Sequence, residues 1–239
     1  MPGALGSTYG VGAAGSRVSD ALVGLIPLAA GVAVNPLPVI ALILILQTPR
    51  GRSAGFAFVG AWIVALFVLG GLAVVVANQT DLYGSGSSSM VARIIRGGVG
   101  ALLLVWAGSK WFGRPRSDED ATSPAWMNAL ASTTPAKSAR LGGLLAAGNP
   151  KNIALTLAAA AGVVETGLPL ASELAALAFF VLLATLGVAT PLVAYLSLGS
   201  RADDVLAGWG RWLTRHNASV MAIVLLVLGL LLVAGAVKG

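Results

Sequence analysis

Four long stretches of this chain contain no charged side chain, and they constrain its fold more than any other feature. A transmembrane helix needs about 20 predominantly apolar residues to cross a hydrocarbon core roughly 30 Å thick. Each stretch is at least that long, so each is predicted to cross a membrane. They are residues 21–49, 53–80, 174–200 and 217–237.

Two further apolar segments carry basic side chains. Residues 94–111 contain Arg96 and Lys110 near their ends, where long basic side chains can reach the headgroups. Residues 141–164 are interrupted by Lys151. Together with the uncharged stretches, these segments predict six membrane spans.

The expected fold class is all-α. Hydrophobic residues make up 57% of the chain and charged residues only 10%, far from the usage of soluble domains. In lipid, every backbone polar group must be satisfied internally, so segments of this length should be helices. The chain has no cysteine, which excludes disulfides and thiolate metal sites. The first twenty residues, rich in Gly, Ala and Ser, are expected to form a flexible lead.

Basic residues divide unevenly between the predicted loops, and this division gives an orientation by the positive-inside rule. We expect both termini outside a plasma membrane that the chain crosses repeatedly. The net charge of +6 then reflects membrane topology, and no nucleic acid partner is predicted. One side holds Arg50, Arg52, Lys110, Arg114, Arg116, Lys137, Arg140, Arg201, Arg211 and Arg215, and the other holds Arg17, Arg93, Arg96 and Lys238.

The chain is predicted to contain two related halves. Residues 1–112 form the lead and a first three-helix repeat, 113–140 a cytoplasmic linker, and 141–239 a second three-helix repeat. The halves share a local pattern, GVAVNPLPVIALIL and LLAAGNPKNIALTL. With an odd number of spans in each half, the second half enters from the opposite side, an inverted arrangement common in secondary transporters.

The shared Asn-Pro step is a helix-start signal. Asn is a favoured N-cap, and Pro is favoured at the first helical position. Asn35 lies about 21 Å into its segment and Asn149 about 12 Å, so both steps fall inside the hydrocarbon core. We therefore expect the N-termini of two half-helices near the centre of the membrane, each with a partial positive charge.

These helix starts, with the charge of Lys151, predict a binding site for an anionic or polar group. In the alternative interpretation, the prolines only kink helices and the asparagines tie helices together by hydrogen bonds. Thr156, Thr185 and Thr190 are further candidates for a pathway, although packing alone also explains them. The other candidates are Asn35, Pro36, Pro38, Asn149, Pro150, Lys151 and Asn152.

The sequence offers little for catalysis or metal binding. An intramembrane transferase would need a nucleophile or base with a partner, and the sole histidine, His216, stands at the start of the last span beside Arg215. No acidic residue is central to a predicted span, whereas hard cations need oxygen ligands. We predict no enzyme activity, no metal and no cofactor, and keep a transferase as the least favoured alternative.

Several spaced motifs resemble the Sap/GAP family, the sulfolipid- and glycopeptidolipid-addressing proteins of the LysE transporter superfamily. They are GNPKN, PRGRSAGFAFVGAW, PAWMNALASTTPAKSARLGGLLAAGNPKNIAL and WLTRHNASVMAIVLLVLGL. The resemblance implies six helices in two inverted triplets and a role in moving lipids or glycolipids to the surface of actinobacteria with mycolate-type envelopes. It also implies that the protein works beside a larger lipid exporter. Whether the chain forms a homo-oligomer is left open.

The superfamily pattern maps directly onto Asn149, Pro150 and Lys151. It reaches Asn35, Pro36 and Pro38 less closely, because the amino-acid exporters have Pro-Gly-Pro where this chain has Asn-Pro-Leu-Pro. We therefore predict a lipid transport protein with the polar or anionic headgroup bound between the repeats. Export of a small anionic or zwitterionic metabolite is the alternative.

Overall fold

The computed structural model describes residues 6–79, 88–113 and 133–238, and all regular structure in these ranges is helical. The predicted all-α class is thus confirmed. A single 3-10 turn, η3 (Gly199–Arg201), precedes the last helix. The helices are α1 (Gly6–Ala33), α2 (Pro36–Leu46), α3 (Gly51–Gln79), α4 (Ser88–Phe112), α5 (Pro135–Ala147), α6 (Pro150–Val164), α7 (Leu170–Leu198) and α8 (Ala202–Lys238).

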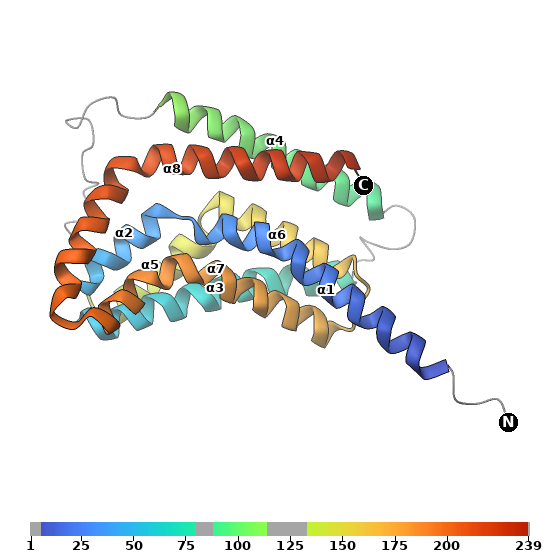
Figure 1. Cartoon of the computed structure of the whole chain (residues 1–239), viewed down its shortest axis with the longest axis horizontal. Helices are drawn as coiled ribbons and strands as arrows, with labels where there is room; N and C mark the ends of the chain where they lie inside the picture. Colours follow the sequence, from blue (N-terminus) through green and yellow to red (C-terminus); the bar gives the residue numbers. More distant parts are fainter. Residues whose placement is uncertain (1–5, 80–87, 114–132, 239) are drawn as a thin grey trace.

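The helices lie roughly along one long axis, as Figure 1 shows. α1 and α2 run in one direction, α3 runs back in the opposite direction, and α5 with α6 runs opposite to α1 with α2. Both chain termini point toward the same end of the molecule. The most extensive packing is between α4 and α8, between α3 and α5, and between α1 and α7.

Both Asn-Pro steps break a helix, as their chemistry predicts. α1 ends at Ala33 and α2 begins at Pro36, with a bend of 57° between the two axes. α5 ends at Ala147 and α6 begins at Pro150. Proline occupies the first helical position after each break, where its missing N–H removes no hydrogen bond.

The boundaries of two predicted segments differ from the structure. α1 already begins at Gly6, so the expected flexible lead is helical from that residue onward. No proline interrupts the sequence between Gly6 and Ile26, which lets the helix extend toward the N-terminus. α5 begins at Pro135, within the predicted linker, with Thr134 as its N-cap. Residues 114–132 of that linker lie outside the described part of the chain.

Three helices in the described ranges are long and apolar enough to cross a membrane: α3, α7 and residues 202–235 of α8. Counting the bent pair of α1 and α2 as one span gives a fourth. The two weaker segments fall in α4 and in α5 with α6, and α6 (Pro150–Val164) is apolar but short. The six-span topology therefore stays a prediction. The conclusion that the chain is a membrane protein depends on the helices that are long and apolar enough to cross.

α2 forms the centre of the core. It is apolar on every side, as expected of a buried helix. Large side chains of α3 pack beside it, with Phe58 and Trp62 fully buried. The short α2 helix thus holds the first break deep inside the protein.

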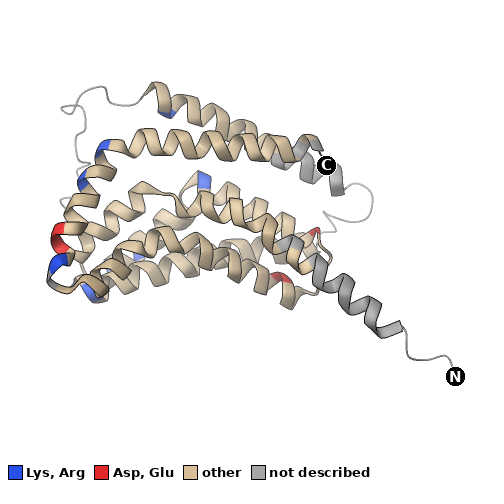
Figure 2. Cartoon of the chain, viewed as in Figure 1, with Lys and Arg blue, Asp and Glu red and all other residues tan. Residues whose placement is uncertain are grey.

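Charged side chains mark the two ends of the molecule, as Figure 2 shows. Lys and Arg gather at the end away from the termini, in agreement with the sidedness expected from the sequence. Arg114 and Arg116, which belong to the same predicted side, lie outside the described residues. The described basic residues of that side are Arg50, Arg52, Lys110, Lys137, Arg140, Arg201, Arg211 and Arg215.

Candidate functional site

Lys151 joins the two breaks. It stands in the first turn of α6, and its side chain is fully buried. Its ammonium Nζ donates to the carbonyl oxygen of Gly31 at 2.8 Å and to that of Val34 at 2.9 Å. The last carbonyls of a helix have no partner within the helix and carry a partial negative charge. A lysine from the second half therefore caps the end of α1 in the first half.

The side chains of Asn149 and Asn152 form hydrogen bonds with backbone groups on both sides of the second break. The side-chain Oδ1 of Asn149 accepts from the backbone N–H of Lys151 at 3.0 Å, so Asn149 is the N-cap that the sequence predicts. The Nδ2 of Asn152 donates to the carbonyls of Leu145 at 3.3 Å and Ala146 at 3.1 Å, near the end of α5. The first turn of α6 thus also caps the helix that precedes it.

Asn35 behaves differently from Asn149. It stands at the predicted N-cap position of α2, but its side chain makes no capping hydrogen bond there. Its Nδ2 instead donates to the Oδ1 of Asn152 at 3.4 Å. Because Asn152 directs its own amide nitrogen at α5, its oxygen is left as a buried acceptor, and Asn35 satisfies it. Here the alternative interpretation, asparagines tying helices together, describes the geometry.

Asn35, Asn149, Lys151 and Asn152 therefore form one polar cluster, which we call the midplane cluster. The N-termini of α2 and α6 both lie at it, with Pro36 and Pro38 buried in the first turn of α2 and Pro150 exposed. In this conformation the ammonium of Lys151 is enclosed, and backbone carbonyls occupy two of its donors. An anion would have to replace those carbonyls.

The three candidate threonines divide into two groups. Thr156, one turn beyond Asn152 on α6, is buried, and its hydroxyl has no hydrogen-bond partner among the described residues. Thr185 donates to Val181 O at 2.7 Å, within α7. Thr190 is exposed and donates to Leu186 O at 2.8 Å. Thr156 is thus the threonine with an unused polar atom, while the hydroxyls of Thr185 and Thr190 satisfy carbonyls of their own helix.

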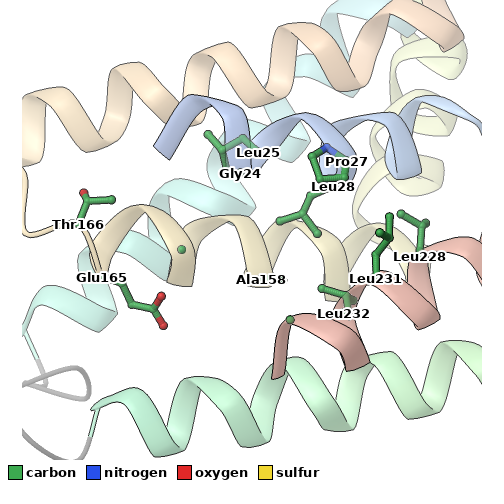
Figure 3. Close-up of a pocket in the computed structure, with 12 residues that line it drawn as sticks. Gly24, Leu25, Pro27, Leu28, Ala158, Glu165, Thr166, Leu228, Leu231 and Leu232 are labelled. Atoms are coloured by element: carbon green, nitrogen blue, oxygen red, sulfur yellow. The ribbon is translucent and has the colours of Figure 1, made fainter. Parts of the chain in front are cut away.

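A cavity of about 500 Å³ lies between α1, α6 and α8, and no residue of the midplane cluster lines it. Figure 3 shows Glu165 and Thr166 at one end of it and Leu228 toward the other. We call it the lateral cavity. Sequence reasoning did not find it, because it arises from segments far apart in the chain. Its lining is Gly24, Leu25, Pro27, Leu28, Ala158, Gly162, Glu165, Thr166, Leu228, Leu231, Leu232 and Gly235.

Leu228 links the lateral cavity to the backbone beside the midplane cluster. It lines the cavity and also packs against Gly31, whose carbonyl accepts from Lys151. A Cβ atom on Gly31 would lie 2.5 Å from Leu228 Cδ1 and 2.9 Å from Leu155 Cδ1. An alanine here would force these side chains to shift, because Leu228 and Leu155 form a leucine layer over Gly31.

A buried carboxylate was also missed. Glu173 in the first turn of α7 is 1% exposed and accepts from Asn78 Nδ2 at 2.6 Å, near the end of α3. His216 makes only local contacts in the described structure, with its ring 4.7 Å from that of Trp212 and Nδ1 2.8 Å from Trp212 O. The Glu173 contact links α7 to α3, and the His216 contacts lie within α8.

Comparison with known proteins connects this architecture to one family. No curated protein and no solved structure matches the chain. The family model described as Sap, sulfolipid-1-addressing protein, matches residues 25–238. This range includes both Asn-Pro breaks, the midplane cluster and every lining residue of the lateral cavity except Gly24. This lipid-related membrane family is the one that the sequence motifs indicated. The chain therefore belongs to the Sap, sulfolipid-1-addressing protein family.

Proposed function

We propose that this protein moves a lipid or glycolipid to the cell surface, or helps to move it. The observation that carries the proposal is the lateral cavity, about 500 Å³ of mostly apolar space. Its lining residue Leu228 packs against Gly31, whose carbonyl accepts from the buried Lys151. Ligand sites commonly have volumes of about 300–1,000 Å³ and combine apolar walls with a few polar groups. A lipid matches this division, because its chains are apolar and its headgroup is polar.

The proposed topology has six spans in two inverted repeats, with the basic end in the cytoplasm and both termini outside the plasma membrane. Each half contains a broken helix followed by two long unbroken helices. The packing supports a two-fold relation, because α1 packs on α7 as α5 packs on α3, and α2 packs on α8 as α6 packs on α4. The opposite directions of the two broken helices in Figure 1 support inversion.

In the proposed mechanism, the headgroup binds at the midplane cluster while acyl chains occupy the lateral cavity or the bilayer. The Lys151 hydrogen bonds to Gly31 and Val34 keep the site closed in the absence of the headgroup. A hydrogen bond to a charged group contributes about 1.5–3 kcal/mol, so opening is favourable only when headgroup oxygens replace the carbonyls. Rocking of one repeat against the other would then expose the site alternately.

The test is replacement of Lys151 by Gln in cells that lack the native copy. Surface-extractable lipid is compared with the total lipid pool, and the variant should retain lipid inside. The control is Lys137→Gln, an exposed lysine on α5 that should leave surface lipid unchanged. Normal surface lipid with stably expressed Lys151→Gln protein would overturn the proposed role of Lys151.

Export of a small anionic or zwitterionic metabolite is the second candidate, favoured by the enclosure of the midplane cluster. Full deletion separates the two functions. Lost surface lipid supports lipid transport, whereas unchanged lipids with altered resistance to an amino acid support metabolite export. We also propose a larger lipid exporter as a partner, which crosslinking in the native membrane would identify.

A further inference from the structure

A separate cavity of about 470 Å³ lies at the basic end of the molecule, where α2 leads into α3. It shares no residue with the lateral cavity or the midplane cluster. We call it the arginine pocket. Its lining consists of Pro49, Arg50, Arg52, Ser53, Phe56 and Tyr195.

The described lining of the arginine pocket is positively charged, with two arginines and no acidic residue. Arg50 and Arg52 flank Gly51, the first residue of α3, and both side chains are exposed. The first turn of α3 holds no acidic residue, and neither arginine forms an ion pair with a residue that the structure describes. A guanidinium presents a planar set of donors that matches phosphate or sulfate oxygens in bidentate geometry.

Backbone donors at the start of α3 add to the arginines. Gly51 N–H donates to Thr48 O at 2.8 Å and Ala54 N–H to Arg50 O at 3.0 Å. Between them, the N–H groups of Arg52 and Ser53 belong to the first turn, where a helix provides no acceptor. The partial positive charge of the helix start also favours an anion there. The pocket therefore combines two guanidinium groups with backbone donors.

An apolar surface continues from the arginine pocket along α3. Phe56 follows Arg52 by four residues, so the two lie on the same face of the helix. Phe56 is 52% exposed, and the face continues through Val64 at 60% and Phe67 at 36%. Gly60 between them has open space where a side chain would be. This arrangement suits a charged headgroup with an acyl chain attached, and a free anion would use only the polar part.

We propose that the arginine pocket binds the phosphate or sulfate group of an anionic membrane lipid, with one acyl chain along the exposed face of α3. The site is distinct from the midplane cluster. Its occupant belongs to the leaflet at the basic end of the protein.

Binding to the purified full-length protein tests this proposal. Native mass spectrometry compares the affinity for phosphatidylglycerol with that for phosphatidylcholine, and inorganic phosphate serves as the free anion. We expect the wild type to prefer phosphatidylglycerol. The double variant Arg50→Gln, Arg52→Gln should bind it at least about tenfold more weakly, because charge-assisted hydrogen bonds are lost. Phe56→Ala should weaken phosphatidylglycerol binding without changing the response to phosphate.

The matched control is Arg211→Gln, which removes an exposed arginine of α8 that does not line the pocket. An equal loss in the control, or no loss in the double variant, would overturn the proposal. Equal affinities for phosphate and phosphatidylglycerol, both insensitive to Phe56→Ala, would assign the pocket to a free anion and reject the lipid. Because the assay measures binding and not export, its result is independent of the proposed transport function.

Discussion

The two Asn-Pro breaks occupy corresponding places in the two halves but are stabilised in different ways. At the second break, Asn149 caps α6 and Asn152 caps the end of α5, both from within the same half. At the first break, Asn35 caps nothing in its own helix, and the end of α1 depends on Lys151 from the other half. The second break is self-sufficient and the first is not.

This difference suggests which part of the midplane cluster moves. The first turn of α6 supplies the polar groups for both breaks, so it is the fixed part. The end of α1 is held by donors from outside its own half and is free to separate when a competing acceptor arrives. We therefore expect the first break to open and the second to stay intact. The predictions below test that asymmetry.

Replacement of Lys151 by Met should have the largest effect on stability. It would leave the carbonyls of Gly31 and Val34 buried without their donor, and each unsatisfied group costs about 1–3 kcal/mol. We expect a loss of about 2–5 kcal/mol in the free energy of unfolding, measured by denaturant titration in detergent. Lys137→Met, at an exposed site, should stay close to wild type. Equal stabilities for the two variants would show that Lys151 does not hold the first break.

Replacement of Asn152 by Leu should rank next. Its amide nitrogen donates to two carbonyls of α5 and its oxygen accepts from Asn35, so three hydrogen bonds disappear together. We expect a loss of about 2–3 kcal/mol, against about 1 kcal/mol for Asn35→Leu, which removes one long hydrogen bond. If Asn35→Leu proves the more damaging change in the same unfolding assay, the proposed asymmetry is wrong.

The sequence predicted the helix breaks because Asn and Pro act locally. Pro36 and Pro150 begin helices as expected, and Asn149 caps as expected. For Asn35 the alternative interpretation, an asparagine that ties helices together, was the correct one. Its partner was not predictable, because Asn152 is 117 residues away. The same holds for Lys151, whose sequence position indicated a buried charge but not which carbonyls it contacts.

The lateral cavity could not be predicted from the sequence for a related reason. Its walls come from α1, α6 and α8, and glycines such as Gly24, Gly162 and Gly235 leave the space. In an apolar segment, a glycine can allow two helices to pack closely or can leave a cavity. Only the assembled fold distinguishes these two cases. Gly31 contacts two leucines closely, while Gly24 has nothing within 4 Å of an added Cβ.

Those two glycines of α1 provide a matched pair for the next prediction. Gly31→Ala should destabilise the protein by about 1–3 kcal/mol, because the new methyl group collides with Leu228 and Leu155 beside the first break. Gly24→Ala should be neutral or stabilising, since alanine favours a helix over glycine by about 0.5–1 kcal/mol. Thermal unfolding in one detergent compares them. A similar shift in both would mean that the leucine layer over Gly31 is loosely packed.

The smallest expected effect is at the cap of α6. Asn149→Ala removes the acceptor for the Lys151 backbone N–H, and loss of an N-cap costs about 1 kcal/mol. Asn149→Asp keeps a capping oxygen and should restore most of that stability. Asn35→Asp should restore none, because it removes the Nδ2 group that donates to Asn152 Oδ1. Unfolding of the four single variants, with Asn35→Ala as the fourth, measures this contrast. Rescue by Asp at position 149 but not at position 35 requires that the two asparagines have different roles, whereas rescue at both would mean that Asn35 is a cap as well.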